Sequence, residues 1–109
     1  MELRTISRAT IGYTTLVLIH PNETEPYYGA DSKDTRVHTA PISASTQFFS
    51  GFGLCGSSQT FTFDDKGLGT TLCTQSAAAK VINSGRPSQV LVTVGADGTV
   101  SKVQEMFHP

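Results

Sequence analysis

The C-terminal segment 89–106 constrains the fold most, because "QVLVTVGADGTVSKVQEM" has the pattern of a β-hairpin. In its first half every second residue is valine, and Leu91 and Thr93 lie on the other face. The three valines that share the first face are Val90, Val92 and Val94. Asp97-Gly98 is a dipeptide typical of tight hairpin turns. In the returning strand, alternation predicts that Val100 and Val103 lie on opposite faces.

The rest of the chain also favours strands. The 109 residues include 15 threonines and 11 serines, while only 16% are charged. Threonine is β-branched and suits a pleated, half-exposed surface. We predict one long bent strand or a hairpin over residues 2–19, with Leu3 and Ile6 on opposite faces. Further strands are predicted at 35–43, 45–54, 58–63 and 68–73, and a loop at 20–34.

One short helix is predicted over residues 74–84, "TQSAAAKVINS". Thr74 is an acceptable N-cap, the alanines are strong helix formers, and Gly85 follows where a helix commonly ends. Three apolar residues would form its buried stripe: Ala78, Val81 and Ile82.

These elements predict one mainly β domain over residues 1–109, a β-rich α+β arrangement with the helix before a C-terminal hairpin. Its strands would form either a small antiparallel sheet or a barrel of five to six strands. The order is compatible with that of an oligonucleotide/oligosaccharide-binding barrel if the middle hairpins are merged. This is a comparison of architecture only, because no sequence motif identifies a family.

The run "FFSGFGLCGSS", residues 48–58, is the most unusual in the chain. Its "GFGLCG" matches the G-x-G-x-x-G pattern of dinucleotide-binding proteins, but that pattern requires a helix at the third glycine. A strand-like run, "SSQTFTF", follows here, so we interpret the match as chance. We expect a strand bent at Gly51 or Gly53, with phenylalanines on both of its faces.

Cys55 and Cys73 are the only cysteines. Our main interpretation is that both are small buried side chains; a disulfide and a reactive thiol are the alternatives. A nucleophilic Cys55 would need a base, and His38 is the best-placed histidine in the sequence. No diagnostic spacing supports this pair, so a small cysteine-dependent hydrolase or transferase is a secondary hypothesis.

Clustered aromatic residues without a catalytic spacing point to a non-enzymatic binding module with an aromatic-lined pocket or groove. The predicted ligand-binding residues are Tyr27, Tyr28, Arg36, His38, Phe48, Phe52 and Cys55. The partner would be a small molecule or a second copy of the chain. Single-stranded nucleic acid, with Lys33, Arg36 or Arg86 near its phosphates, has weaker support.

The charge balance gives no reason to expect a polyanionic partner. The net charge is −1, from 8 basic and 9 acidic residues, so no general attraction to nucleic acid or an anionic membrane is expected. We predict no metal site, no cofactor and no membrane span. Because the first twenty residues lack a secretory signal pattern, the predicted location is cytoplasmic.

Overall fold

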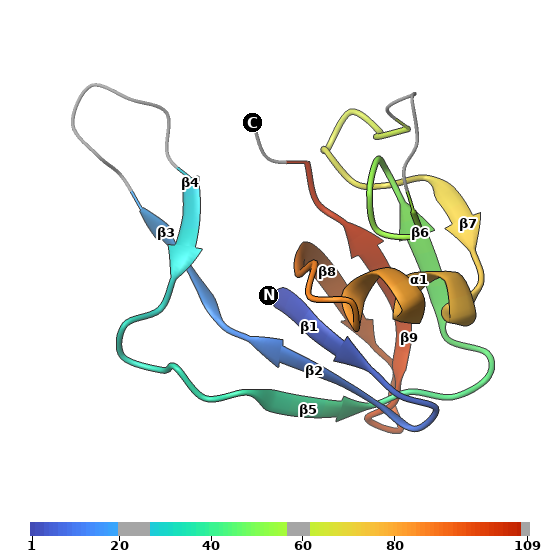
Figure 1. Cartoon of the computed structure of the whole chain (residues 1–109), viewed down its shortest axis with the longest axis horizontal. Helices are drawn as coiled ribbons and strands as arrows, with labels where there is room; N and C mark the ends of the chain where they lie inside the picture. Colours follow the sequence, from blue (N-terminus) through green and yellow to red (C-terminus); the bar gives the residue numbers. More distant parts are fainter. Residues whose placement is uncertain (20–26, 57–61, 108–109) are drawn as a thin grey trace.

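The structure is a computed structural model that describes residues 1–19, 27–56 and 62–107, of which 17–19 and 27–30 are described by backbone alone. It is mainly β, with one short helix before the last two strands (Figure 1). The strands are β1 (Glu2–Ile6), β2 (Thr10–Thr14), β3 (Leu16–Ile19), β4 (Tyr27–Ala30), β5 (His38–Pro41), β6 (Gln47–Ser50), β7 (Thr71–Cys73), β8 (Ser88–Val94) and β9 (Val100–Glu105). The helix is α1 (Gln75–Ile82).

Seven strands form one sheet in the order β5-β2-β1-β8-β9-β6-β7. Every neighbouring pair is antiparallel except β6 and β9, which run parallel. The sheet is therefore mixed rather than purely antiparallel. It is also open, because β5 and β7 end the order, and the predicted alternative of a closed barrel is wrong.

β3 and β4 form a separate antiparallel ribbon. It extends from the end of β2 away from the main sheet (Figure 1). The sequence predicted a loop throughout 20–34, so the strand β4 within that range is a correction. The predicted strand 58–63 falls mostly on residues outside those that the structure describes.

The helix covers one face of the sheet over β1 and β6 (Figure 1). It follows the prediction closely: the Thr74 side chain caps it by accepting a hydrogen bond from Ala77 N, and Ala78 and Ile82 are buried. At its other end, the Asn83 side chain accepts from Ile6 N at 3.0 Å and donates to Ile6 O at 2.8 Å. These two bonds join the end of the helix to the end of β1.

The core depends on two breaks in strand alternation. Leu3 and Ile6 are both buried, as are Val100 and Val103, although simple alternation predicted opposite faces for each pair. The ladder shifts register between Leu3 and Thr5 in β1, and again in the β8–β9 hairpin. Each irregularity inserts a residue and turns the following side chains to the core face.

Candidate functional site

The glycine-rich segment after β6 folds around the carboxylate of Glu105, at the end of β9. The backbone N–H groups of Gly51, Phe52, Gly53 and Leu54 all donate to Glu105 Oε1, at 2.9, 3.0, 3.2 and 3.0 Å. The Ser50 hydroxyl donates to the same oxygen at 3.3 Å. Successive amides that converge in this way form an anion-binding concavity, which here holds a carboxylate of the chain itself. We call residues 51–56 the Glu105 loop.

Glu105 is half-buried, and its charge depends on these donors. Desolvation by burial raises the pKa of this carboxyl, but hydrogen bonds from the four loop amides outweigh it, so the net pKa lies below the ordinary value. Hydrogen bonding to the charged form of an acid has this effect. Glu105 is therefore ionised at neutral pH.

Three further contacts fix the Glu105 loop. A disulfide joins Cys55 to Cys73 of β7, which corrects the main expectation of two separate buried thiols. Leu54 is fully buried in the core. The ring of Phe63 lies so close to Gly51 that a Cβ at Gly51 would be 2.2 Å from it, so only glycine fits there.

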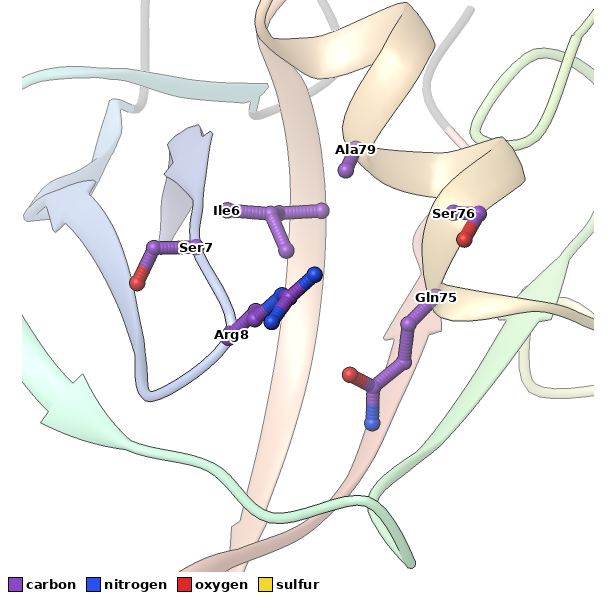
Figure 2. Close-up of a pocket in the computed structure, with 6 residues that line it drawn as sticks. All are labelled: Ile6, Ser7, Arg8, Gln75, Ser76 and Ala79. Atoms are coloured by element: carbon purple, nitrogen blue, oxygen red, sulfur yellow. The ribbon is translucent and has the colours of Figure 1, made fainter.

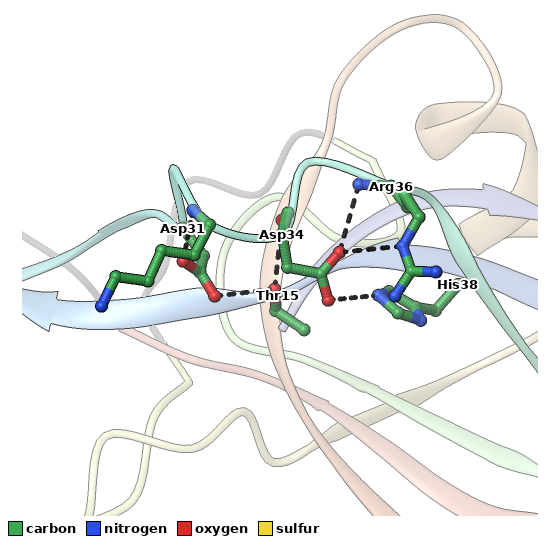
Figure 3. A network of polar contacts seen from close by, with 6 residues as sticks. Thr15, Asp31, Asp34, Arg36 and His38 are labelled. Atoms are coloured by element: carbon green, nitrogen blue, oxygen red, sulfur yellow. Dashed lines mark hydrogen bonds and ion pairs between the residues drawn. The ribbon is translucent and has the colours of Figure 1, made fainter.

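A second polar cluster lies at the opposite edge of the sheet, where the β3–β4 ribbon joins β2 and β5 (Figure 3). His38 Nε2 lies 2.7 Å from Asp34 Oδ2, and the Arg36 guanidinium pairs with the other oxygen of that carboxylate. Thr15 donates weakly toward Asp31 at 3.5 Å and to the Asp34 carbonyl at 3.4 Å. The hydrogen bond with His38 lowers the pKa of Asp34 despite the opposing effect of desolvation. We call these five residues the His38 cluster.

A groove beside the first turn of α1 has a volume of about 600 Å³, and we call it the large groove. None of its lining residues is charged, and most of the surface that they expose to the groove is apolar: Ala44, Ser45, Thr46, Gln47, Leu72, Cys73, Thr74, Gln75 and Ser76. A smaller pocket of about 260 Å³ lies on the other side of the same turn, between α1 and the β1–β2 connection (Figure 2). Arg8 and Gln75 extend into the space between these two elements (Figure 2).

Several groups that face the large groove have no protein partner among the described residues. Gln75 N and Ser76 N are the unpaired first amides of the helix. The Ser76 hydroxyl and the side-chain amide of Gln47 likewise make no hydrogen bond within the described chain. By contrast, Gln75 Nε2 is occupied, because it donates to Ser43 O at 2.6 Å and to Thr46 O at 3.2 Å. The groove thus offers a few free hydrogen-bonding groups, two of them helix N–H donors, beside a largely apolar surface.

The structure distributes the residues predicted to bind a ligand over several places. Phe48 is 0% exposed and belongs to the core, so it has no surface for a ligand. Phe52 is 42% exposed in the Glu105 loop, and Cys55 is held in the disulfide. Arg36 and His38 meet through Asp34 at the other edge of the sheet.

For Tyr27 and Tyr28, the structure describes the backbone in β4, and their side chains lie outside the description.

The proposed partnership of Cys55 with His38 has no geometric support. Cys55 is bonded to β7 and His38 lies in β5, and these are the two end strands of the seven-stranded order. Within the described chain, the only hydrogen-bond partner of the His38 ring is Asp34, and Tyr13 stacks on the ring at 5.5 Å. No nucleophile therefore stands beside this imidazole in the part of the protein that is described.

Sequence reasoning missed Glu105, whose side chain accepts hydrogen bonds from five groups of the described chain. Glu105 is separated from the amides it binds by more than fifty positions, and no local pattern around it signals a role. The literal "GFGLCG" match was the usable signal. Its glycines do present backbone amides to an anion, as in phosphate-binding loops, but the anion is internal.

The uncovered face of the sheet carries one apolar row. Leu91 pairs with Gln104, Gln104 with Phe49, and Phe49 with Leu72, so these four residues lie side by side on four adjacent strands. Leu72 and Leu91 are exposed, and Lys102 lies 5.7 Å from the centre of the Phe49 ring. The expectation that phenylalanines occupy both faces of β6 is confirmed, because Phe48 points to the core and Phe49 to this open face. The expected strand bent at Gly51 or Gly53 is wrong, because β6 ends at Ser50 and residues 51–56 form a loop.

Comparisons with protein-family models, curated proteins and solved structures found no match to this chain. Among the described residues, no helix is both long and apolar enough to cross a bilayer. In the same residues, no group of three or more His, Cys, Asp or Glu side chains is arranged to hold a metal ion. The functional argument therefore depends on local geometry alone.

Proposed function

We propose that this domain is a non-enzymatic binding module whose ligand occupies the groove beside the first turn of α1. The observation that carries the proposal is the combination of size and lining. A volume of about 600 Å³ lies within the range of small-molecule sites. The free polar groups around it include two N–H donors, and they are held by a capped helix and a sheet edge.

The lining supports an oxygen-rich neutral ligand. No charged residue lines the groove, so neither a strong cation nor a strong anion gains a direct ion pair there. The N–H groups of Gln75 and Ser76 would pair with oxygen acceptors, and Leu72 offers an apolar surface. Neutral saccharides combine hydroxyl oxygens with apolar C–H faces, and they are the class that this lining favours.

Saturation-transfer NMR with a panel of neutral disaccharides tests the proposal. We expect weak binding, with Kd in the range of about 0.1–10 mM typical of few hydrogen bonds, which Gln47→Ala and Ser76→Ala reduce severalfold. Gln104→Ala is the control, because it removes an amide from the same sheet outside the groove. Binding that is unchanged in both groove variants, or absent for every sugar while capped dipeptides bind, would contradict the saccharide assignment.

Self-association is a second candidate, favoured by the apolar row on the open face. The row has a leucine at each end, so a two-fold axis can place Leu91 of one copy against Leu72 of the other. Sedimentation velocity between about 10 μM and 1 mM, which spans the weak affinities expected of a small patch, would detect a dimer. Leu91→Lys would abolish that dimer, while a monomer throughout would remove this candidate.

The location of the protein is also a proposal. Disulfides persist mainly in oxidising compartments, so the Cys55–Cys73 bond favours such a compartment over the cytoplasm predicted from the sequence. Binding of single-stranded nucleic acid stays a weaker prediction, because no Lys or Arg lines the large groove.

A further inference from the structure

The Glu105 loop is held in place in three ways, of which only one is the disulfide. Leu54, directly before Cys55, is fully buried in the core. The four amides of residues 51–54 bind Glu105, and β6 pairs with β7 through its own ladder. Opening the disulfide therefore leaves both cysteines on elements that have other anchors.

The disulfide is also within reach of a small thiol. Cys55 and Cys73 are both half-buried rather than enclosed. Cys73 forms part of the wall of the large groove, which is open to solvent. A reagent that enters the groove therefore approaches the disulfide from the Cys73 side, because Cys55 is not among the lining residues.

We propose that Cys55–Cys73 is a reversible thiol–disulfide exchange site that reacts with dithiols, and that Glu105 keeps the loop in place while the bond is open. A dithiol thiolate attacks Cys73 Sγ from the groove, the Sγ–Sγ bond breaks, and Cys55 leaves with the electron pair and takes up a proton. The second thiolate of the reagent then attacks the other sulfur of the reagent, which is bonded to Cys73 in the mixed disulfide. This forms a cyclic disulfide and releases Cys73, so two electrons pass from the dithiol to the protein.

Glu105 has a positioning role in this exchange. By fixing residues 51–54, it holds Cys55 near Cys73 and favours closure of the bond. Glu105→Gln keeps the size of the side chain but loses the charge that strengthens the hydrogen bonds. We expect this variant to be reduced at a dithiol-to-disulfide ratio about tenfold lower than the wild-type protein, as the loss of charge-assisted hydrogen bonds implies.

The test uses dithiothreitol at defined ratios of reduced to oxidised reagent at pH 7, followed by trapping with N-ethylmaleimide and intact mass. We expect two labelled thiols and an unchanged far-UV circular dichroism spectrum. Glu2→Gln is the matched control, because Glu2 carries a carboxylate paired with Arg4 on β1, away from the loop. Loss of the β-sheet signal together with reduction would show a purely structural disulfide and overturn the proposal.

If Glu105→Gln is reduced at the same dithiol-to-disulfide ratio as Glu2→Gln, the proposed role of Glu105 is overturned. Where Glu105→Gln does not fold, hydrogen exchange on the wild-type protein decides instead: the amides of residues 51–54 should stay protected after reduction, and their loss of protection would contradict the anchor. A further expectation depends on the proposed function, namely that reduction changes disaccharide affinity through the Cys73 wall. The redox measurements use no ligand, so they stand or fail separately from the groove proposal.

Discussion

Two regions of the molecule each hold a carboxylate of lowered pKa, but they hold it by different means: the Glu105 edge, where β6 and β9 end, and the Asp34 edge, beside β5. Glu105 is half-buried and bound by converging backbone amides that belong to one loop. Asp34 pairs with the His38 ring and with Arg36, whose side chain is 82% exposed. Backbone donors keep their positions without loss of side-chain freedom, whereas exposed ion pairs contribute little because water and salt screen them. The first arrangement fixes the loop that carries Cys55, and the second lies where a ribbon joins the sheet.

The largest difference between the two edges in their contribution to the unfolding free energy should come from packing. Leu54→Ala removes a fully buried side chain from the Glu105 loop and should cost about 2–5 kcal/mol of unfolding free energy. Val37→Ala, beside the His38 cluster, truncates an exposed side chain and should change stability by less than about 0.5 kcal/mol. Urea unfolding of both variants makes the comparison, and equal losses would show that the loop is not part of the core.

The next difference concerns the carboxylates themselves. Glu105→Ala leaves four amides without their acceptor and should cost about 2–3 kcal/mol, less than the full sum because water reaches part of the loop. Asp34→Asn should leave the urea midpoint nearly unchanged, because Arg36 is exposed and the asparagine can still hydrogen-bond with His38 Nε2. A larger shift for Asp34→Asn than for Glu105→Ala would reverse the comparison.

The sequence was sufficient to predict the elements but not their long-range contacts. Thr74, the alanines and the Asp97-Gly98 turn act locally, and the helix and the last hairpin were predicted from them. The pairing of β6 with β9 and the binding of Glu105 by residues 51–54 join segments about fifty positions apart, and no periodicity encodes them. Alternation failed at Leu3/Ile6 and Val100/Val103 for a related reason, because a register irregularity is set by the neighbouring strand.

The candidate site was predicted less well than the fold. Aromatic clustering in sequence placed Phe48 in a ligand site, but β-strand alternation sends Phe48 to the core and Phe49 to the open face. The groove is lined instead by serines, threonines and glutamines from segments 44–47 and 72–76. Such common residue types carry no signal until the fold brings them together.

Acid should weaken the Glu105 edge first. Because the pKa of Glu105 is lower in the folded state, the unfolded chain binds more protons at acidic pH. Its contribution is complete above the unfolded glutamate pKa of about 4.3 and is lost as the pH falls through the lower folded value. Urea midpoints measured from pH 6 down to pH 3 should fall steeply for the wild-type protein and less steeply for Glu105→Gln. Asp34→Asn should keep most of the wild-type dependence of the urea midpoint on pH. A midpoint that no longer depends on pH in that variant would show that the acid sensitivity comes from Asp34 and not from Glu105.

The smallest expected effect is at Arg36. Its guanidinium is exposed and its ion pair with Asp34 is at the 3.5 Å limit of close contact. Arg36→Ala should change the unfolding free energy by less than about 0.5 kcal/mol, and added salt should have no larger effect on the wild-type protein. A loss of more than 1 kcal/mol, a threshold set by the usual range for exposed pairs, would show that the His38 cluster is more rigid than its exposure indicates.

The central claim is that ligands dock beside α1 and not at the His38 cluster. The most direct measurement is a ¹⁵N HSQC titration of the oxidised protein with the neutral disaccharides lactose, maltose and cellobiose. We expect dose-dependent shifts at the backbone amides of Gln47, Gln75 and Ser76, with the backbone amides of Thr15, Asp34 and His38 unchanged. Shifts confined to the His38 cluster, or no shift at either edge with any of the three sugars, would contradict it.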